Sequence, residues 1–139
     1  MPQLPSGLPE IVEDGEDLAR FLFSSGHYNS TGIKPAAFLP NPKDHETSVF
    51  RHGAKPATDL WKLGSDLASS GRGLRGVAIL QARDVRDIGL DIIAAEPPPR
   101  HAAIRNWPVD TDPFLQKAQQ KELALLLAQA AGRPILNQT

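Results

Sequence analysis

The sequence predicts one α+β domain, built from a small, mostly antiparallel sheet of about four strands with two or three packing helices. A chain of 139 residues, 40% of them apolar, has the size of a single domain and can bury a core without disulfides. Apolar runs of strand length alternate irregularly with helix-like segments. The connection between the last two predicted strands is too short for a parallel crossover, which favours antiparallel pairing.

The domain is expected to span residues 14–133, between flexible tails at residues 1–13 and 134–139. The first tail is rich in proline, which disfavours both helix and sheet, and the second follows the predicted end of the last helix. No segment of the chain repeats another, so a single domain without internal duplication is expected.

The first half of the domain is expected to form one helix and two strands. Carboxylates at the start of the segment 14–24 lie where the helix dipole favours negative charge, and apolar residues follow at helical spacing. Residues 26–35 have the composition of a polar loop. The apolar runs 36–39 and 47–52 then predict two antiparallel strands, since the residues between them include two prolines and an asparagine.

The second half is expected to add a helix, two strands and a helical turn. The helical pattern of residues 58–69 begins at a threonine and is followed by glycine. The segment 73–82 holds the clearest strand, because its run Val-Ala-Ile-Leu is apolar on both faces and fits a central position. A short helical turn at 84–88 and another strand at 90–95 complete this part.

The last helix carries start and stop signals. Asp112 is a typical N-cap, Pro113 occupies the first helical position, and Gly132 lies just beyond the end. Residues 123–131 are apolar almost all round the helix, so we expect them to be largely covered. The cover is either the core of the domain or a second copy of the chain, which makes a structural role through self-association one alternative function.

Three successive prolines, residues 97–99, follow the last predicted strand. Proline has no N–H and a fixed φ, so we expect the chain to leave the sheet there as a stiff, extended segment. Beyond the prolines come two guanidiniums, an imidazole and an indole, which belong to Arg100, Arg105, His101 and Trp107. Guanidiniums bind anions and an indole stacks or packs, so we expect these residues to contribute to a ligand-binding site.

The strand at residues 47–52 also ends in cationic side chains. Arg51 and His52 would join the Arg100–His101 pair in one cluster if the two strand ends lie side by side. Two guanidiniums hold a phosphate group in bidentate fashion. The sequence therefore predicts a small binding or accessory protein that recognises an anionic partner: a phosphate-bearing ligand, a nucleic acid or an acidic protein surface.

An enzyme is the second alternative. Two imidazoles with separated pKa values act as acid and base, so His52 and His101 are the candidate catalytic pair of a metal-independent enzyme that acts on a phosphate ester. The polar loop adds His27 and Lys34 as candidate ligand-binding residues. The triplet Arg51-His52-Gly53 resembles the histidine phosphatase signature, but the rest of the chain lacks the alternating strands and helices of that family.

Composition excludes several classes of site. The chain has no cysteine, which removes disulfides, thiolate nucleophiles and zinc sites built on sulfur. The histidines lie far apart and no carboxylate cluster has ligand spacing, so no metal and no cofactor is expected. The net charge of -1 lacks the basic surplus usual in nucleic-acid binders. With no bilayer-length apolar run and no secretory signal, we expect a cytoplasmic protein.

Four segments carry a further resemblance. They are Arg20-Phe21-Leu22 with Ser24-Ser25-Gly26-His27-Tyr28, then Lys34-Pro35-Ala36-Ala37-Phe38-Leu39-Pro40, then Ser48-Val49-Phe50-Arg51, and Pro98-Pro99-Arg100-His101-Ala102 with Ile104, Trp107 and Pro108. In these segments the chain resembles a group of small bacterial proteins of unknown function, over about residues 18–130. The resemblance implies a bacterial protein whose polar positions share one site, and it implies no activity.

Overall fold

A six-stranded antiparallel sheet forms the centre of the fold, in a computed structural model that describes residues 4–51, 57–68 and 73–136. Its strands are β1 (Asp17–Leu22), β4 (Thr47–Arg51), β5 (Gly76–Gln81), β6 (Asp91–Ala94), β7 (His101–Arg105) and β8 (Ile135–Leu136). They stand in the order β6-β7-β4-β1-β5-β8. A separate hairpin pairs β2 (Tyr28–Asn29) with β3 (Gly32–Ile33). The α+β class and the antiparallel sheet are as predicted, but the main sheet has six strands rather than about four.

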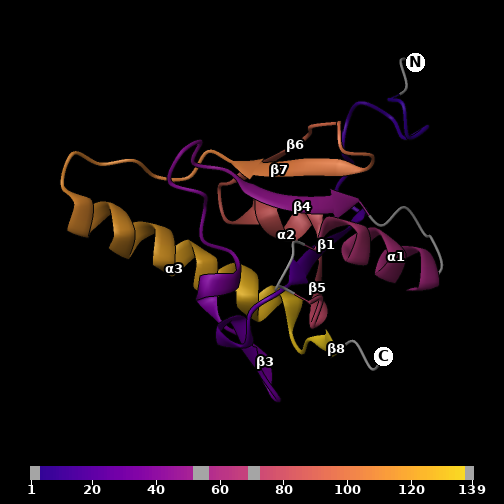
Figure 1. Cartoon of the computed structure of the whole chain (residues 1–139). Coiled ribbons are helices and arrows are strands. Elements are labelled where there is room, and N and C mark those ends of the chain that lie inside the picture. Colours follow the sequence, from indigo (N-terminus) through magenta and orange to yellow (C-terminus); the bar gives the residue numbers. More distant parts are fainter. Residues whose placement is uncertain (1–3, 52–56, 69–72, 137–139) are drawn as a thin grey trace.

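Helices connect and cover these strands. They are α1 (Ala57–Leu67), α2 (Ala82–Asp87) and α3 (Pro113–Ala131), with 3-10 turns η1 (Ser25–His27) and η2 (Pro35–Ala37). Figure 1 shows α3 running beneath the sheet and α1 beside the end of β4. The structure confirms the strands predicted within 47–52, 73–82 and 90–95 and the helices predicted at 58–69 and 84–88, with small shifts of their ends.

One face of the sheet packs against α3, α2 and η2. The buried residues on this side include Leu18, Leu22, Val49, Ala78, Leu80, Ala102, Ile104, Ala124, Leu127 and Ala128. The predicted caps of α3 are confirmed, since the Asp112 side chain accepts hydrogen bonds from the first turn and Gly132 follows the end with φ 69°. Leu125 and Leu126 remain about two-fifths exposed, so the core of the domain does not cover these two residues, and self-association through α3 stays a prediction.

The other face of the sheet packs against α1 over only part of its area. Ala19, Phe21 and Phe50 form a second core with α1 residues. The helix approaches closely because it carries Gly64 here: a Cβ at this position would lie 2.7 Å from the Phe21 ring. Towards β7 the same face opens to solvent, where Ser48 is exposed.

The helix predicted at residues 14–24 is wrong, because this segment forms the central strand β1. Leu18 and Leu22 face the α3 side, whereas Ala19 and Phe21 face the α1 side. A strand that is buried on both faces is apolar in nearly every position, so its residues also fall at helical spacing. Asp14, read as part of the helix start, instead forms an ion pair with Arg86, with 2.6 Å between Oδ1 and Nη1.

The strand predicted at 36–39 and the extended exit predicted at 97–99 are also wrong. Pro35 starts the 3-10 turn η2, which closes when the Phe38 N–H donates to the Pro35 carbonyl. The prolines at 97–99 form the tip of a hairpin rather than an exit, since the chain turns back and resumes its ladder at His101. A hairpin tip needs few ladder donors, so proline is tolerated there. The sequence prediction therefore missed β7.

Both regions expected to be flexible tails make contacts in the part of the chain that the structure describes. Val12 is buried in the core beside the main sheet. Ser6 donates hydrogen bonds to the Glu96 carboxylate from its backbone N–H and its hydroxyl. At the other end, Ile135 pairs with Val77 as the edge strand β8.

Candidate functional site

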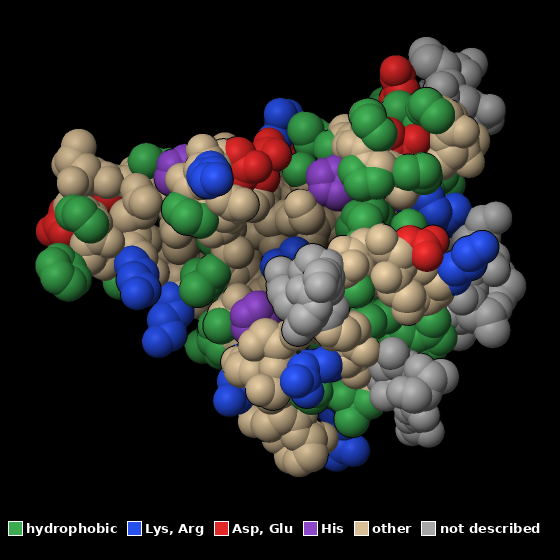
Figure 2. Space-filling model, in the orientation of Figure 1, with side chains coloured by type: hydrophobic (Ala, Val, Ile, Leu, Met, Phe, Trp, Pro, Cys, Tyr) green, Lys and Arg blue, Asp and Glu red, His purple; other side chains and the backbone are tan. Residues whose placement is uncertain are grey.

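The open part of the α1-side face holds a cavity of about 310 Å³. Its lining combines three phenylalanines with three polar side chains: Phe21, Phe23, Phe50, Arg20, Ser48 and His101. Leu67 at the end of α1 and Pro98 at the β6–β7 turn are the other lining residues in the described part of the chain. Figure 2 shows histidine and basic side chains spread over the visible face, in separate places. The cavity thus offers an apolar, aromatic interior with a few polar groups.

Three rings stand in a row across β1, β4 and β7. The ring centroids of Phe21 and Phe50 are 5.5 Å apart, and those of Phe50 and His101 are 5.3 Å apart, with tilted planes in both pairs. Phe50 and His101 are direct partners in the β4–β7 register. Aromatic pairs favour tilted geometry at centroid distances of roughly 4.5–7 Å, so the row holds its rings in place.

The imidazole of His101 is fixed in one tautomer. Its Nδ1 lies 2.8 Å from the carbonyl oxygen of Ala95. A carbonyl only accepts hydrogen bonds, so Nδ1 carries a proton and Nε2 of the neutral ring keeps its lone pair. Among the described residues Nε2 has no hydrogen-bond partner, and the ring lines the cavity. His101 can therefore accept a hydrogen bond or a proton from a bound molecule.

Arg20 brings a guanidinium to the place where β1 and β4 separate. Within the described residues, the two strands pair at Leu18–Arg51 and Ala19–Phe50, and this pairing ends before Arg20. Beyond these pairs, Arg20 Nε donates to the carbonyl oxygen of Ala37 and Nη1 to that of Ser48, both at 2.8 Å. These two bonds fix the plane and position of the guanidinium. The positive charge is thus held at the edge of the cavity by the backbone itself.

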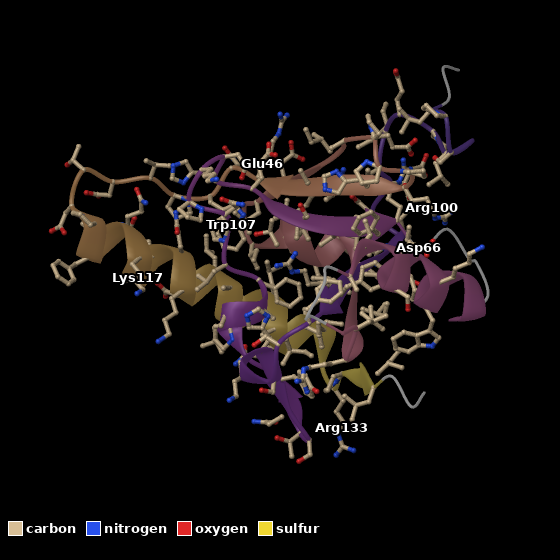
Figure 3. All side chains as sticks on the ribbon, viewed as in Figure 1. Glu46, Asp66, Arg100, Trp107, Lys117 and Arg133 are labelled. Atoms are coloured by element: carbon tan, nitrogen blue, oxygen red, sulfur yellow. The ribbon has the colours of Figure 1, made fainter. Side chains whose placement is uncertain are left out.

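A second cavity, of about 350 Å³, adjoins the first. The two cavities share Arg20 and Ser48 in their linings. The second is more polar, and its other polar lining residues include His27, Asn41 and Glu46. Figure 3 shows Glu46 near the start of β4 and Arg100 at the opposite side of the sheet, just before the start of β7. His27, predicted from the polar loop, therefore lies in a neighbouring cavity and not with the residues of the 100–107 segment.

The end of β4 lies beside the start of β7, which from the sequence was only a condition for an Arg–His cluster, and Arg51 faces away from the cavity. Its backbone N–H donates to the Arg100 carbonyl oxygen at 2.8 Å. The Arg51 side chain is fully buried and forms a two-pronged ion pair with Glu16, with both N–O distances at 2.8 Å. Two further bonds reach the carbonyls of Pro9 and Ile11. Arg51 thus ties the N-terminal segment to the sheet.

The ion pair with Arg51 changes the pKa of the Glu16 carboxyl group. Burial raises its pKa, but the hydrogen bond from Arg51 and the nearby positive charges outweigh burial, so the pKa lies below its ordinary value of 4.5. A carboxyl whose pKa falls on folding stabilises the folded state above its unfolded pKa, and this contribution disappears as the pH falls through the folded pKa.

We expect the free energy of unfolding to fall as the pH drops from about 5 to about 3, and the Glu16→Gln variant to lose less over this range. The variant is less stable than the natural chain at about pH 7, because glutamine cannot pair with the Arg51 charge. Urea unfolding at a series of pH values measures both effects. Equal losses in the two proteins would show that Glu16 does not contribute to the acid sensitivity.

Glu96 and Arg100 support the hairpin tip. Arg100 Nε donates to the carbonyl oxygen of Arg51 at 2.8 Å. Burial raises the pKa of the Glu96 carboxyl, but hydrogen bonds from Ser6 and from the Arg100 backbone outweigh it, so the pKa is lowered. Arg100 is not among the lining residues of the two cavities described above. Its bond to the neighbouring strand therefore points to a structural contribution at this end of the sheet.

The other predicted site residues are spread over the molecule. Arg105 lies 3.6 Å from an Asp91 carboxylate oxygen, at the opposite end of β7 from the hairpin tip. Trp107 is 4% exposed, and its Nε1 donates a hydrogen bond to the Ile104 carbonyl. This indole therefore packs inside the protein rather than stacking on a ligand, and Figure 3 places it between the sheet and α3. Lys34 is exposed beside η2. His52 lies outside the described residues.

The sequence prediction missed most of the first cavity. Arg20, Phe21 and Phe23 were read as parts of a helix and its end, and Phe50 and Ser48 as parts of an ordinary strand. The usable signal was alternation: the run from Leu18 to Phe23 places apolar residues on both faces of a strand, with one arginine among them. A charged residue inside such a run suggests a point where the sheet opens.

Within the described residues, no group of three or more histidine or acidic side chains is arranged to hold a metal ion. In the same part of the chain, no helix combines the length and apolarity that a membrane span requires. No model of a known protein family, no curated protein sequence and no solved structure matches this chain.

Proposed function

We propose that this protein binds a small organic anion with an aromatic body in the cavity beside Arg20 and His101. The supporting observation is the lining itself, in which three phenylalanine rings and a fixed guanidinium meet in one hollow of about 310 Å³. This volume lies at the lower end of the roughly 300–1,000 Å³ of small-molecule sites. The proposal keeps the anionic partner predicted from the sequence, but Arg20 replaces Arg51 as the cationic anchor.

Charge and hydrogen bonding favour an anion over a neutral ligand. None of the described lining residues is acidic, whereas Arg20 is cationic. Ser48 adds a hydroxyl, and His101 adds an imidazole with a free lone pair on Nε2. A phosphate monoester can contact all three groups, because its oxygens accept hydrogen bonds from the guanidinium and the hydroxyl, and Nε2 accepts one from a protonated phosphate oxygen.

The probe for this proposal is 4-nitrophenyl phosphate, titrated into the protein by calorimetry. A ligand of about fourteen non-hydrogen atoms at roughly 0.3 kcal/mol per atom gives a Kd of about 1 mM. We expect His101→Ala to weaken binding about tenfold, because a ring contact and a hydrogen bond are lost. Arg105→Ala is the matched control, since it changes the same strand at its other end.

The proposal fails if the natural chain shows no heat of binding at millimolar probe. It also fails if Arg105→Ala weakens binding as much as His101→Ala. Arg105 lies at the other end of β7, so an equal loss would show that binding does not depend specifically on the cavity. Amide NMR spectra of both variants establish that each is folded before the affinities are compared.

One observation also favours the enzymatic alternative. The Ala95 carbonyl holds His101 in the tautomer that leaves Nε2 basic, which is the arrangement of a general base. In such a reaction Nε2 would take a proton from water, the water oxygen would bond to phosphorus, and the bond from phosphorus to the 4-nitrophenolate oxygen would break. Release of 4-nitrophenolate during the titration, abolished in His101→Gln, supports this alternative, and its absence contradicts it for this ester.

A further inference from the structure

The second cavity differs from the first in its chemistry although the two adjoin. Its described lining contains an acidic residue, Glu46, and an amide, Asn41, where the first has phenylalanine rings. Among the described residues, both linings contain Arg20 and Ser48 and share no other side chain. A molecule that enters both cavities therefore passes the guanidinium and the hydroxyl at its middle.

Glu46 is the group that sets the character of the second cavity. The residue is half-buried, and its carboxylate forms no ion pair or hydrogen bond within the described residues. Its backbone is held in place, since its N–H donates to Asp44 and its carbonyl accepts from the Asn41 N–H. A positioned carboxylate in a hollow favours a cationic hydrogen-bond donor, such as a primary ammonium group.

The three residues that define the path of the ligand belong to β4 and to the residue just before it. Glu46 directly precedes β4, and Ser48 and Phe50 follow at every second position, so the three share one face of the sheet. At about 3.4 Å per residue the path from Glu46 to Phe50 is roughly 14 Å long, with Ser48 halfway. Carboxylate, hydroxyl and aromatic ring thus follow one another in order.

We propose that the two cavities hold one ligand, a phosphodiester that joins an aromatic group to a short primary amine. This inference rests on the proposed function and names its ligand class more closely. A diester is the form that keeps one negative charge at Arg20 while carrying a substituent on each side. A carboxylate or a phosphate monoester carries only one substituent, and a carboxylic ester carries no charge.

Two matched diesters test this inference: 4-nitrophenyl 2-aminoethyl phosphate and 4-nitrophenyl 2-hydroxyethyl phosphate. They differ only in the ammonium group, so their affinity ratio measures the contact with Glu46. We expect the amine to bind about tenfold more tightly, and the ratio to fall to about one in Glu46→Gln. The control Glu122→Gln, an exposed acid on α3, should keep the ratio of the natural chain.

The outcomes separate this inference from the proposed function. Equal affinity for the two diesters, or a ratio that survives in Glu46→Gln, overturns the inference even if 4-nitrophenyl phosphate binds. If the monoester does not bind but the aminoethyl diester binds in a Glu46-dependent manner, the inference stands and the monoester proposal is wrong. If none of the three compounds binds, both are overturned.

Discussion

Replacing Glu16 by alanine is expected to lower the free energy of unfolding by about 3–5 kcal/mol, the usual cost of leaving a buried charge without its partner. The Arg51 guanidinium is fully buried and receives both of its carboxylate contacts from Glu16. The carbonyls of Pro9 and Ile11 also accept from this guanidinium, but they do not neutralise its charge. Urea unfolding followed by circular dichroism measures the loss.

The second variant in this experiment separates a buried-charge penalty from a simple loss of contacts. Adding Arg51→Met to Glu16→Ala removes the stranded charge, so the double variant should be more stable than Glu16→Ala alone. Glu13→Ala, an exposed acid nearby, is the control and should change the stability by less than about 0.5 kcal/mol. A double variant whose loss equals the sum of the two single losses would contradict the ion-pair account.

Replacing Arg20 by methionine is expected to abolish detectable binding of 4-nitrophenyl phosphate and to lower the free energy of unfolding by about 2 kcal/mol. The two effects have separate causes. Loss of binding follows from removing the positive charge that lines both cavities. Loss of stability follows from leaving the Ala37 and Ser48 carbonyls without their charged donor at the point where β1 and β4 separate.

Arg20→Lys distinguishes charge from geometry at this position. Lysine keeps the charge but lacks the planar fork that reaches two carbonyls at once. We therefore expect Arg20→Lys to bind the probe within about tenfold of the natural chain, while its stability stays close to that of Arg20→Met. If Arg20→Met binds the probe like the natural chain, the anion does not lie at Arg20. Calorimetry and urea unfolding supply the two readouts.

Local signals were sufficient for much of the fold. Asp112, Pro113 and Gly132 mark both ends of α3, because capping depends on neighbouring backbone groups. The run from Val77 to Leu80 identified β5 as a central strand for an equally local reason. The prediction failed where a sequence fits the spacing of both a helix and a strand. In β1, the apolar residues fit a strand that is covered on two faces and also the apolar stripe of a helix.

The candidate site could be predicted only in part. The sequence named His101 as a candidate, but the pairing of β4 with β7 was only a condition of that prediction, because local patterns do not fix strand order. The arginine beside it did not follow from the sequence, because Arg51 and His101 lie on opposite faces of neighbouring strands. Side chains alternate across a strand with a period of two, so a shift of one residue moves a cation from the cavity to the core.

Short-range sequence signals were enough for the α+β class, for α1, α2 and α3, and for the strands β4, β5 and β6 of the main sheet, because each of these depends on local backbone chemistry. The tertiary structure alone decided that Arg51 is an internal tie to Glu16 and that Arg20, Phe21, Phe50 and His101 line one cavity. The reason is register: which side chains share a face is set by how β1, β4 and β7 align, and that alignment depends on packing over the whole sheet.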